Sequence, residues 1–585
     1  MADAAAFPDR DLDSIREARE LARRARAAQT RLADLSQEQV DTIVDAVAAA
    51  AQREVKAFAR LAVDETGYGN EADKIKKNRF AAETIYNFIQ PMRTVGVINR
   101  RESERIIEIA EPFGVVAAIV PSTNPTSTAI YKILVCLKAR CAVVLSPHPS
   151  AARSIIRVAD VLTRAALSVG APEGAVNCMT TITQEGTLEL MRSREVALIL
   201  ATGGLGLVRA AYSAGKPAYG VGPGNAPAYI ERTADVPKAV ADIITGKTFD
   251  NGVLCSSENS VVVDEAVAGD VRRAFEKQGG RFLNPLEAAK LAEVLVTPQR
   301  LPNPELVGKS AIEIAARVGI EITGDTRVLI ATLTGVGRDH PLSMEKLCPV
   351  LSFYEVSDWR AAGARCKEIL AYGGMGHTMS IHSGDERIIL EFGLQEPAFR
   401  IVVNSPTTLG AIGMTTGLDP SMTLGCGGWG GNITSDNVTP RHLLNVKRLA
   451  YETRSAPRPS ATVAGGPALP LQQAPDRPVT HGVDPAVLNE RIELFLASRG
   501  IASTTPAPLE DQAPTLPPAA PPTAPTSAAP LPPAATPMDF VCEDDVRQAL
   551  RENRQILVSA ATIITPAARD LGEAQRVFVH ASTPR

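Results

Sequence analysis

One cysteine, Cys255, lies where its thiol could do chemistry. It is in the segment KTFDNGVLCSSENSV, after a glycine-containing loop and directly before the apolar run SVVVD. A thiol in such a place can be a nucleophile if its surroundings increase the fraction of thiolate, since a free thiol has a pKa of about 8.5. The same pattern fits a buried, unreactive cysteine, because free cysteines are common in protein cores. A nucleophilic role also requires an oxyanion donor and a cofactor site.

The other cysteines indicate neither a metal site nor a disulfide framework. They are Cys136, Cys141, Cys178, Cys348, Cys366, Cys426 and Cys542. No two of the eight cysteines form a CxxC pair, which is the spacing typical of zinc sites. We therefore expect no bound metal, and we expect most of these thiols to pack as small buried side chains.

The elements that would position these residues follow from hydrophobic periodicity. Residues 11 to 90 have helical periodicity, clearest in LSQEQVDTIVDAVAAAAQREV. From Gly114 onward, β-branched runs such as GVVAAIVP, CAVVLSPHP and VALILATGG alternate with helical stretches. This alternation predicts a parallel sheet covered by helices, with ligands at the carboxyl ends of the strands. A second α/β region extends from about residue 225 to 413.

Composition limits the classes of function. The chain has 585 residues, 45% of them apolar, and a net charge of -4. This favours a multidomain globular protein and argues against a nucleic-acid or anionic-membrane surface, because such surfaces need clustered Lys and Arg. The N-terminus is charged where a secretory signal would be apolar, and no stretch is apolar for long enough to span a bilayer. We expect a cytoplasmic protein that binds metabolites.

The composition changes after about residue 455. Residues 455 to 537 are rich in Pro, Ala, Thr and Ser, which predicts a flexible tether. Within it, VDPAVLNERIELFLASRG predicts a short amphipathic helix with Asp484 as its cap, Pro485 in its first turn and Gly500 at its end. Its apolar face would comprise Leu488, Ile492, Phe495 and Leu496. A second island, 539–572, combines a helix-like start with a β-branched run.

Six segments resemble, in order, the CoA-acylating aldehyde dehydrogenase family. They are EPFGVVAAIVPSTNPTSTAIYK, VVLSPHP, LATGGLGLVRAAYSAGKPAYGVGPGNAP, KTFDNGVLCSSE, MEKLCPVLSFYE and PSMTLGCGGWGGN. The resemblance covers roughly residues 11 to 451. The nearest likeness is to the aldehyde dehydrogenase half of bifunctional aldehyde-alcohol dehydrogenases and to the propionaldehyde and acetaldehyde dehydrogenases of bacterial microcompartments.

The resemblance implies an α/β aldehyde dehydrogenase fold with a Rossmann-like cofactor domain. The implied domains are a helical lead-in with the NAD(P)-binding domain at 1–224, including an oligomerisation strand near 99–111, and a catalytic domain at 225–413. Residues 414–452 would return to the cofactor domain and the oligomerisation element. The linker would occupy 453–537 with the amphipathic helix at 484–499, and an appendage would occupy 538–585.

The resemblance also assigns roles to single residues. Cys255 matches the nucleophile, and Asn124 of PSTNPTS matches the side chain that binds the oxyanion together with the Cys255 N–H; without the family, Asn124 before Pro125 is an ordinary turn residue. His377 of GGMGHTMS resembles a histidine typical of acylating members. The cofactor-binding candidates are Pro121, Ser122, His148, Thr202, Gly203, Gly204, Gly206, Glu345 and Leu347.

Three of these assignments carry alternatives. Gly203, Gly204 and Gly206 resemble the family's cofactor loop but do not form a regular GxGxxG motif. Glu345 matches a glutamate that hydrogen-bonds the nicotinamide ribose, and the alternative is an exposed helix charge. His148 lies where hydrolytic relatives carry a lysine near the adenosine ribose, and a solitary histidine is more often structural.

The reaction type follows from a difference between this chain and the hydrolytic relatives. Those enzymes activate water with a glutamate in an ELGGK-type motif, whereas this chain has YGVGPGNAP. Without that base, we expect CoA to take the acyl group from Cys255. NAD is the expected cofactor, with NADP as the alternative, and CoA is the expected co-substrate for a short-chain aldehyde. The alternatives are a dehydrogenase that releases a free acid and an inactive scaffold or cargo adaptor.

The resemblance also suggests partners. RRESERIIEIAEP and TPRHLLNVKRLAYE resemble the family's oligomerisation elements, so we expect a dimer or tetramer. The 484–499 helix resembles an encapsulation peptide, and TIITPAARDLG resembles an appendage of several microcompartment enzymes. We therefore expect a microcompartment shell protein as a partner and a location inside a bacterial microcompartment.

Overall fold

The computed structural model describes residues 9–456, the four residues 487, 490, 491 and 494, and most of residues 540–580. The chain divides into two compact units, Met1–Pro459 and Ser460–Arg585. Among the described residues, no helix is long and apolar enough to cross a membrane.

The larger unit begins with helices whose ends the sequence marks clearly. α1 (Arg10–Ala33) is capped by Asp9, and α2 (Gln37–Thr66) has a capping box and ends at Gly67 in the left-handed conformation. Alanine-rich faces of both helices are buried. α3 (Glu71–Arg79), a π-helical segment (Phe80–Ile85) and α4 (Tyr86–Ile89) follow without a break.

A five-stranded parallel sheet forms the first α/β domain. Its strands are β3 (Val115–Val120), β4 (Val143–Pro147), β5 (Val176–Cys178), β6 (Val196–Thr202) and β7 (Ala218–Val221), in the order β5-β4-β3-β6-β7. The connecting helices are α5 (Pro125–Lys138), α6 (Ala152–Ser168), α7 (Gln184–Arg192) and α8 (Leu205–Tyr212). Because the strand order reverses between β3 and β6, a crevice for ligands is expected at their carboxyl ends.

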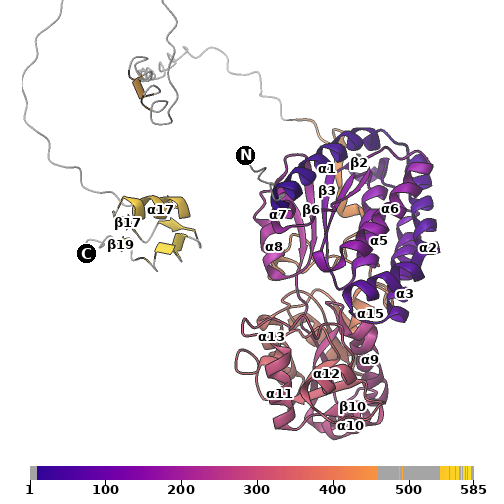
Figure 1. Cartoon of the computed structure of the whole chain (residues 1–585), viewed down its shortest axis with the longest axis vertical. Coiled ribbons are helices and arrows are strands. Elements are labelled where there is room, and N and C mark those ends of the chain that lie inside the picture. Colours follow the sequence, from indigo (N-terminus) through magenta and orange to yellow (C-terminus); the bar gives the residue numbers. More distant parts are fainter. Residues whose placement is uncertain are drawn as a thin grey trace, which may run out of the picture. The chain divides into compact units, whose positions relative to one another are not determined.

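A seven-stranded parallel sheet forms the second α/β domain, below the first in Figure 1. Its strands are β8 (Ala226–Ile230), β9 (Glu258–Asp264), β10 (Gly280–Phe282), β11 (Val328–Thr332), β12 (Val350–Val356), β13 (Met379–His382) and β14 (Ile401–Val403), in the order β10-β11-β12-β9-β8-β13-β14. Its helices are α9 (Val236–Thr248), α10 (Glu265–Lys277), α11 (Pro285–Leu295), α12 (Ala311–Val318), α13 (Trp359–Tyr372), α14 (Glu386–Gln395) and α15 (Thr407–Ala411). The two parallel sheets confirm the predicted α/β class.

A three-stranded antiparallel sheet joins segments that are far apart in the sequence. β1 (Gly96–Arg101) and β2 (Ile106–Pro112) form a hairpin, and β15 (Leu444–Ala450) pairs with β2 over seven residues. In Figure 1 the orange end of the larger unit therefore returns to its indigo and purple part. These strands coincide with the two segments that the sequence suggested for oligomerisation.

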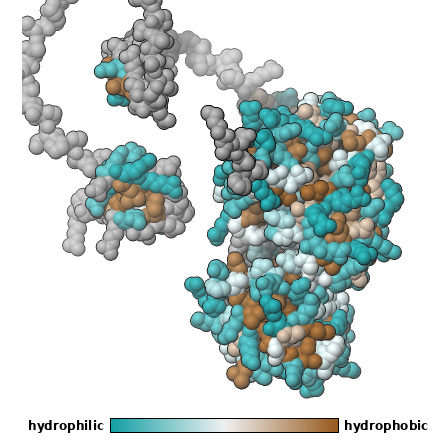
Figure 2. Space-filling view, in the orientation of Figure 1, coloured by the Kyte–Doolittle hydropathy of each residue, from teal (hydrophilic) through white to brown (hydrophobic). Residues whose placement is uncertain are grey.

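The smaller unit has its own buried cluster. β16 (Phe540–Val541) pairs with β18 (Ile563–Ile564), β17 (Ile556–Val558) pairs with β19 (Phe578–His580), and α17 (Glu543–Arg551) covers them. The buried residues are Val541, Val546, Ala549, Ile556, Val558, Ala568 and Val577. Figure 2 shows the hydrophilic face of α17 beside an apolar area of this unit.

The predicted amphipathic helix is described at only four positions. Val487, Glu490, Arg491 and Leu494 are helical and exposed. The proposed apolar anchors Leu488, Ile492, Phe495 and Leu496 lie outside the described residues, as does the rest of the predicted linker beyond residue 456.

Candidate active site

Cys255 lies on a tight loop between α9 and the central strand β9. Asp250, Asn251 and Gly252 have φ values of 47°, 54° and 76°, three successive residues in the left-handed region. That conformation is uncommon for residues other than glycine, so surrounding contacts must hold the loop in place. Cys255 itself is partly exposed, whereas Cys348, two residues before the neighbouring strand β12, is fully buried.

The electrostatic surroundings of Cys255 favour the protonated thiol. Removal from water raises the pKa of the Cys255 thiol to about 12, and the nearby carboxylate of Glu345 also raises it. The guanidinium of Arg400 acts in the opposite direction. At neutral pH the resting thiol therefore keeps its proton, and the reaction needs a group or a conformational change that removes it.

Gly224, from the YGVGPGNAP segment, packs against the nucleophile loop. A methyl group placed on Gly224 would lie 1.9 Å from the Cys255 carbonyl oxygen and 3.1 Å from His377 Nδ1. A methyl group on Gly374 would lie 1.9 Å from the Gly224 carbonyl oxygen. Three backbone segments are therefore stacked at van der Waals distance behind Cys255, and only glycine fits at the two positions.

His377 is a buried, neutral imidazole near this stack. Burial lowers the pKa of His377 to about 3, and the Arg400 guanidinium lowers it further. Nδ1 lies 2.9 Å from the Thr378 hydroxyl group, and Nε2 is buried with no hydrogen-bond partner in the described part of the chain. A buried polar atom without a partner is unusual in folded proteins.

Arg400 is a site residue that sequence reasoning missed. It is buried directly before β14 and donates hydrogen bonds to the carbonyl groups of Ser435, at 2.9 Å, and Gly425. No carboxylate forms an ion pair with it among the described residues, so its charge acts on the neighbouring thiols and imidazole. The segment EPAFRIVVN has no pattern that distinguishes this arginine from an exposed one.

Asn124 precedes α5 and is held by contacts on both sides of its amide. Its Oδ1 accepts a hydrogen bond of 2.6 Å from Lys77 Nζ, and its Nδ2 donates one of 3.2 Å to the Thr123 hydroxyl group. Lys77 also contacts the carboxylate of Asp250, five residues before Cys255. The structure thus links the predicted oxyanion donor to the loop of the predicted nucleophile. Lys77 and Asp250 were not among the predicted site residues.

The predicted cofactor residues come together at the switch point of the five-stranded sheet. Pro121 and Ser122 directly follow β3, His148 directly follows β4, and Thr202 ends β6. The strands are adjacent, since Val120 pairs with Pro147 and Ile119 with Ala201. The N–H of His148 also donates to the Val120 carbonyl group at 2.9 Å.

The end of β6 has the features of a phosphate-binding edge. Thr202 Oγ1 is buried without a hydrogen-bond partner in the described chain, and Gly204 begins α8 without a side-chain cap. A methyl group on Gly204 or Gly206 would meet nothing within 4 Å, so the space above this helix N-terminus is open. Free backbone N–H groups at a helix N-terminus suit a phosphate group, which agrees with the cofactor site that the sequence predicts at this edge.

The other two predicted cofactor residues lie in the second domain. Glu345 is in the loop before β12, where its Oε1 accepts a hydrogen bond of 2.8 Å from the Gly224 N–H. Burial raises the pKa of its carboxyl group. The alternative interpretation of Glu345 as an exposed helix charge is therefore wrong. Leu347 has φ 51°, and its carbonyl group accepts a hydrogen bond of 2.9 Å from Gly308.

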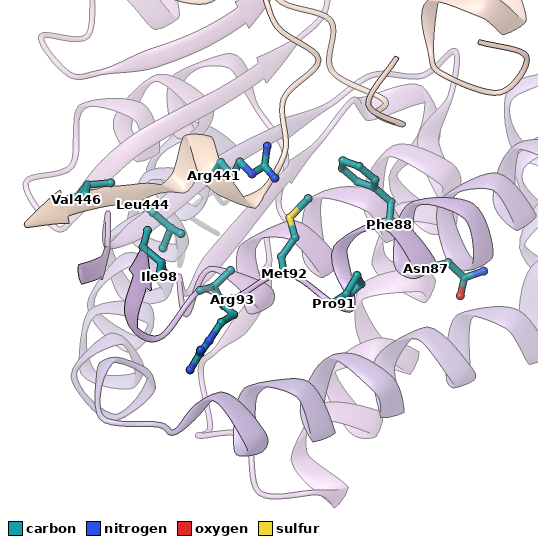
Figure 3. Close-up of a pocket in the computed structure, with 10 residues that line it drawn as sticks. Asn87, Phe88, Pro91, Met92, Arg93, Ile98, Arg441, Leu444 and Val446 are labelled. Atoms are coloured by element: carbon teal, nitrogen blue, oxygen red, sulfur yellow. The ribbon is translucent and has the colours of Figure 1, made fainter. Parts of the chain in front are cut away.

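A pocket of about 720 Å³ lies away from these residues, beside the three-stranded sheet (Figure 3). It is lined by Asn87, Phe88, Pro91, Met92, Arg93, Thr94, Ile98, Arg441, Leu444 and Val446. None of the predicted site residues lines it. Within the described residues, no group of three or more His, Cys, Asp and Glu side chains could hold a metal ion.

Comparison with known proteins decides the family. The model of the aldehyde dehydrogenase family matches residues 6–417. The chain belongs to this family. It is 42% identical over 442 residues to the bifunctional aldehyde-alcohol dehydrogenase AdhE of Escherichia coli (strain K12), an alignment covering 75% of this chain and 50% of that protein. The chain thus spans about half the length of this relative.

Two solved structures of family members share the fold. The acetylating aldehyde dehydrogenase from Geobacillus thermoglucosidasius is 48% identical, with a TM-score of 0.76 over 77% of this chain and 100% of that chain. The Rhodopseudomonas palustris propionaldehyde dehydrogenase, solved with bound CoA and an acylated cysteine, is 26% identical, with a TM-score of 0.67 over 74% of this chain and 96% of that chain.

Proposed function

We propose that this chain is a CoA-acylating aldehyde dehydrogenase, which oxidises a short-chain aldehyde with NAD(P)+ and transfers the acyl group from Cys255 to CoA. The observation that carries the proposal is the packing of Gly224 behind Cys255. The segment that supplies a water-activating carboxylate in hydrolytic relatives has no Asp or Glu here, and a side chain on its Gly224 would overlap the Cys255 carbonyl oxygen. The acetylating and CoA-bound relatives support the same conclusion.

Each step has a residue suited to it. The sulfur of Cys255 adds to the aldehyde carbonyl carbon, and the oxygen that becomes negative is stabilised by the Asn124 amide nitrogen and the Cys255 N–H. His377 is neutral, so it is suited to form hydrogen bonds rather than to carry a charge. The thioester left on Cys255 is then attacked by the CoA thiolate, which regenerates the free thiol.

The cofactor would be held by residues of both domains. Pro121, Ser122, Thr202 and the N-terminus of α8 would bind its phosphates and riboses, and Glu345 would approach it from the second domain. When bound, the nicotinamide supplies the acceptor for the hydride that leaves the aldehyde carbon. NAD is the form we propose, with NADP as the alternative.

One observation favours a second candidate, a dehydrogenase that releases a free acid. The Glu345 carboxylate is close enough to Cys255 to raise the pKa of its thiol, so it could also act on a nearby water molecule. Its Oε1 accepts the Gly224 N–H, which holds the carboxylate next to the nucleophile loop.

The test is a panel of short aldehydes assayed for NADH or NADPH formation with and without CoA. We expect sustained turnover only with CoA, and Cys255→Ala should lower the rate to a few per cent or less, since no other group can form the thioester. Sustained turnover without CoA would favour the acid-releasing alternative. Absence of turnover with every aldehyde would favour the inactive scaffold.

We also propose two kinds of assembly. The sheet of β1, β2 and β15 would join copies of the chain into a dimer or tetramer. The tail helix at 484–499 would bind a microcompartment shell protein and place the enzyme inside the compartment, where a reactive aldehyde is consumed close to its source.

A further inference from the structure

A buried cluster of charges adjoins the predicted oxyanion donor. The side chains of Lys74, Lys77 and Asp250 are each no more than 2% exposed. Both ammonium groups contact the same carboxylate oxygen, Asp250 Oδ2, with Lys74 at 2.9 Å. One carboxylate cannot fully satisfy two buried ammonium groups, so each lysine needs another acceptor.

The second acceptors are at the N-terminus of α5. Lys74 Nζ lies 3.4 Å from the Thr123 carbonyl oxygen, and Lys77 Nζ lies 2.6 Å from Asn124 Oδ1. The contact of Lys77 is the shorter of the two and is therefore the stronger hydrogen bond. Lys77 therefore connects Asp250 directly to the Asn124 side chain.

This contact fixes which way the Asn124 amide faces. Burial lowers the pKa of Lys77 to about 7, while the Asp250 carboxylate acts in the opposite direction and favours the ammonium form. The ammonium form donates hydrogen bonds and accepts none, so the amide atom that it meets is the oxygen. The amide nitrogen then points the other way. It carries two hydrogens, of which one is donated to the Thr123 hydroxyl group, and the second remains free for an oxyanion.

We propose that Lys77 is a positioning residue that holds the Asn124 amide with its nitrogen directed to the oxyanion, and that Asp250 locks Lys77 in this place. The proposal rests on the proposed function in one respect, the role of Asn124 as oxyanion donor. A fixed donor lowers the barrier more than a mobile one, because no reorganisation is needed as the charge develops.

Asp250 extends the same connection to the nucleophile. Its Oδ1 accepts a hydrogen bond of 2.8 Å from the Asn70 N–H, and its own N–H donates to Asp73 Oδ2 at 2.9 Å. A methyl group on Gly69 would lie 1.8 Å from Asp250 Oδ1, so the start of α3 is fitted around this carboxylate. Lys77 and the loop of Cys255 are thereby held by one side chain.

The experiment measures acylation of Cys255 alone. With 4-nitrophenyl acetate, the sulfur attacks the ester carbonyl carbon, the thiol proton passes to solvent, and nitrophenolate leaves with the bonding electron pair as the acetyl thioester forms. Wild type, Lys77→Met, Asn124→Ala and the double variant are compared by the burst of nitrophenolate. Neither aldehyde, cofactor nor CoA takes part, so this result is independent of whether CoA or water is the final acceptor.

We expect Asn124→Ala to slow acylation about 100-fold and Lys77→Met about 10- to 100-fold, with a smaller change in the ester concentration at half-saturation. The double variant should be no slower than Asn124→Ala, because Lys77 acts through Asn124. If the two effects multiply instead, Lys77 does not act through this amide and the proposal is wrong. It is also overturned if Asn124→Ala acylates at the wild-type rate.

A matched control separates positioning from loss of stability. Lys138 is another fully buried lysine, on α5, and it pairs with Asp41 rather than with the site. Lys138→Met should lower the melting temperature as Lys77→Met does but change the acylation rate less than threefold. If Lys77→Met does not fold, the same comparison uses Lys77→Arg, whose larger head group displaces the contact with Asn124 while keeping the charge near Asp250.

Discussion

At the scale of single residues, the site combines groups whose burial sets their charge. The Cys255 thiol keeps its proton because its pKa is raised to about 12, and the His377 imidazole stays neutral because its pKa is lowered to about 3. Both changes follow from removal from water, which disfavours the charged form of each group. The Arg400 guanidinium acts against burial by lowering the pKa of the Cys255 thiol. Burial lowers the pKa of Arg400 itself.

His382 shows the same effect outside the site and gives a pH prediction. Burial lowers its pKa to about 4 from the ordinary value of 6.5, and its Nε2 has no partner in the described chain. Between pH 6.5 and about 4, the unfolded chain binds a proton here that the folded chain does not, so the free energy of unfolding falls as the pH falls. At pH 5 the lowered pKa of His382 reduces the free energy of unfolding by about 2 kcal/mol, relative to a histidine that keeps its ordinary pKa.

We therefore expect His382→Leu to lose less stability than the wild type between pH 7 and pH 5, by about 2 kcal/mol. Urea unfolding at the two pH values measures the difference. An equal loss in both proteins would show that His382 is protonated in the folded state or that it does not titrate in this range.

At the scale of elements, contacts between backbone atoms rather than between side chains determine the packing next to the Cys255 loop. The segment between β7 and β8 meets the Cys255 loop at Gly224, and the segment before β13 meets the Gly224 carbonyl group at Gly374. A side chain at either position would force two of these segments apart. The geometry around the nucleophile is consequently sensitive to substitutions that add a single methyl group.

Gly224→Ala tests this contact. We expect a loss of at least about 100-fold in aldehyde-dependent NADH formation, because the Cys255 loop must move to admit the methyl group. Gly417→Ala is the control, since a methyl group there meets nothing within 4 Å, and its rate should stay within twofold of the wild type. A wild-type rate in Gly224→Ala would show that the backbone segments around Gly224 can move apart without loss of activity.

At the scale of the whole molecule, the three-stranded sheet has an exposed outer strand that is suited to assembly. Leu449 on β15 is 50% exposed, and among the described residues β15 pairs with β2 alone. We expect light scattering to give a mass of two or four chains of 61.9 kDa. Leu449→Asp should lower that mass, whereas Leu390→Asp on α14, at a leucine that is 64% exposed, should not. A monomeric wild type would contradict the proposed assembly.

The tail prediction concerns a second partner. Residues 482–500 fused to a fluorescent protein should co-purify with shells of a bacterial microcompartment, because an amphipathic helix on a tether can place its apolar face in a hydrophobic groove. The double change Ile492→Asp and Phe495→Asp should abolish recruitment. A second reporter with residues 539–572 tests the other island, and recruitment of neither fusion would leave the tail without a role in encapsulation.

Local patterns in the sequence determined the fold class and several of the segments that form the site. Alternating apolar runs predicted parallel strands, because hydrophobic period and turn chemistry are encoded within ten or so residues. Cys255, Asn124 and the residues at the ends of β3 and β6 became candidates through the resemblance of six motifs to a known family. The sequence also located the change of composition after residue 455.

Tertiary structure alone decided how these candidates are held. Lys77 reaches Asn124 across 47 positions and Asp250 across 173, and Glu345 reaches Gly224 across 121. Arg400 is a buried cation only because β14 brings it beneath the carbonyl groups of residues 425 and 435. Contacts between residues so far apart leave no trace in local periodicity, since each residue type alone fits an exposed position equally well.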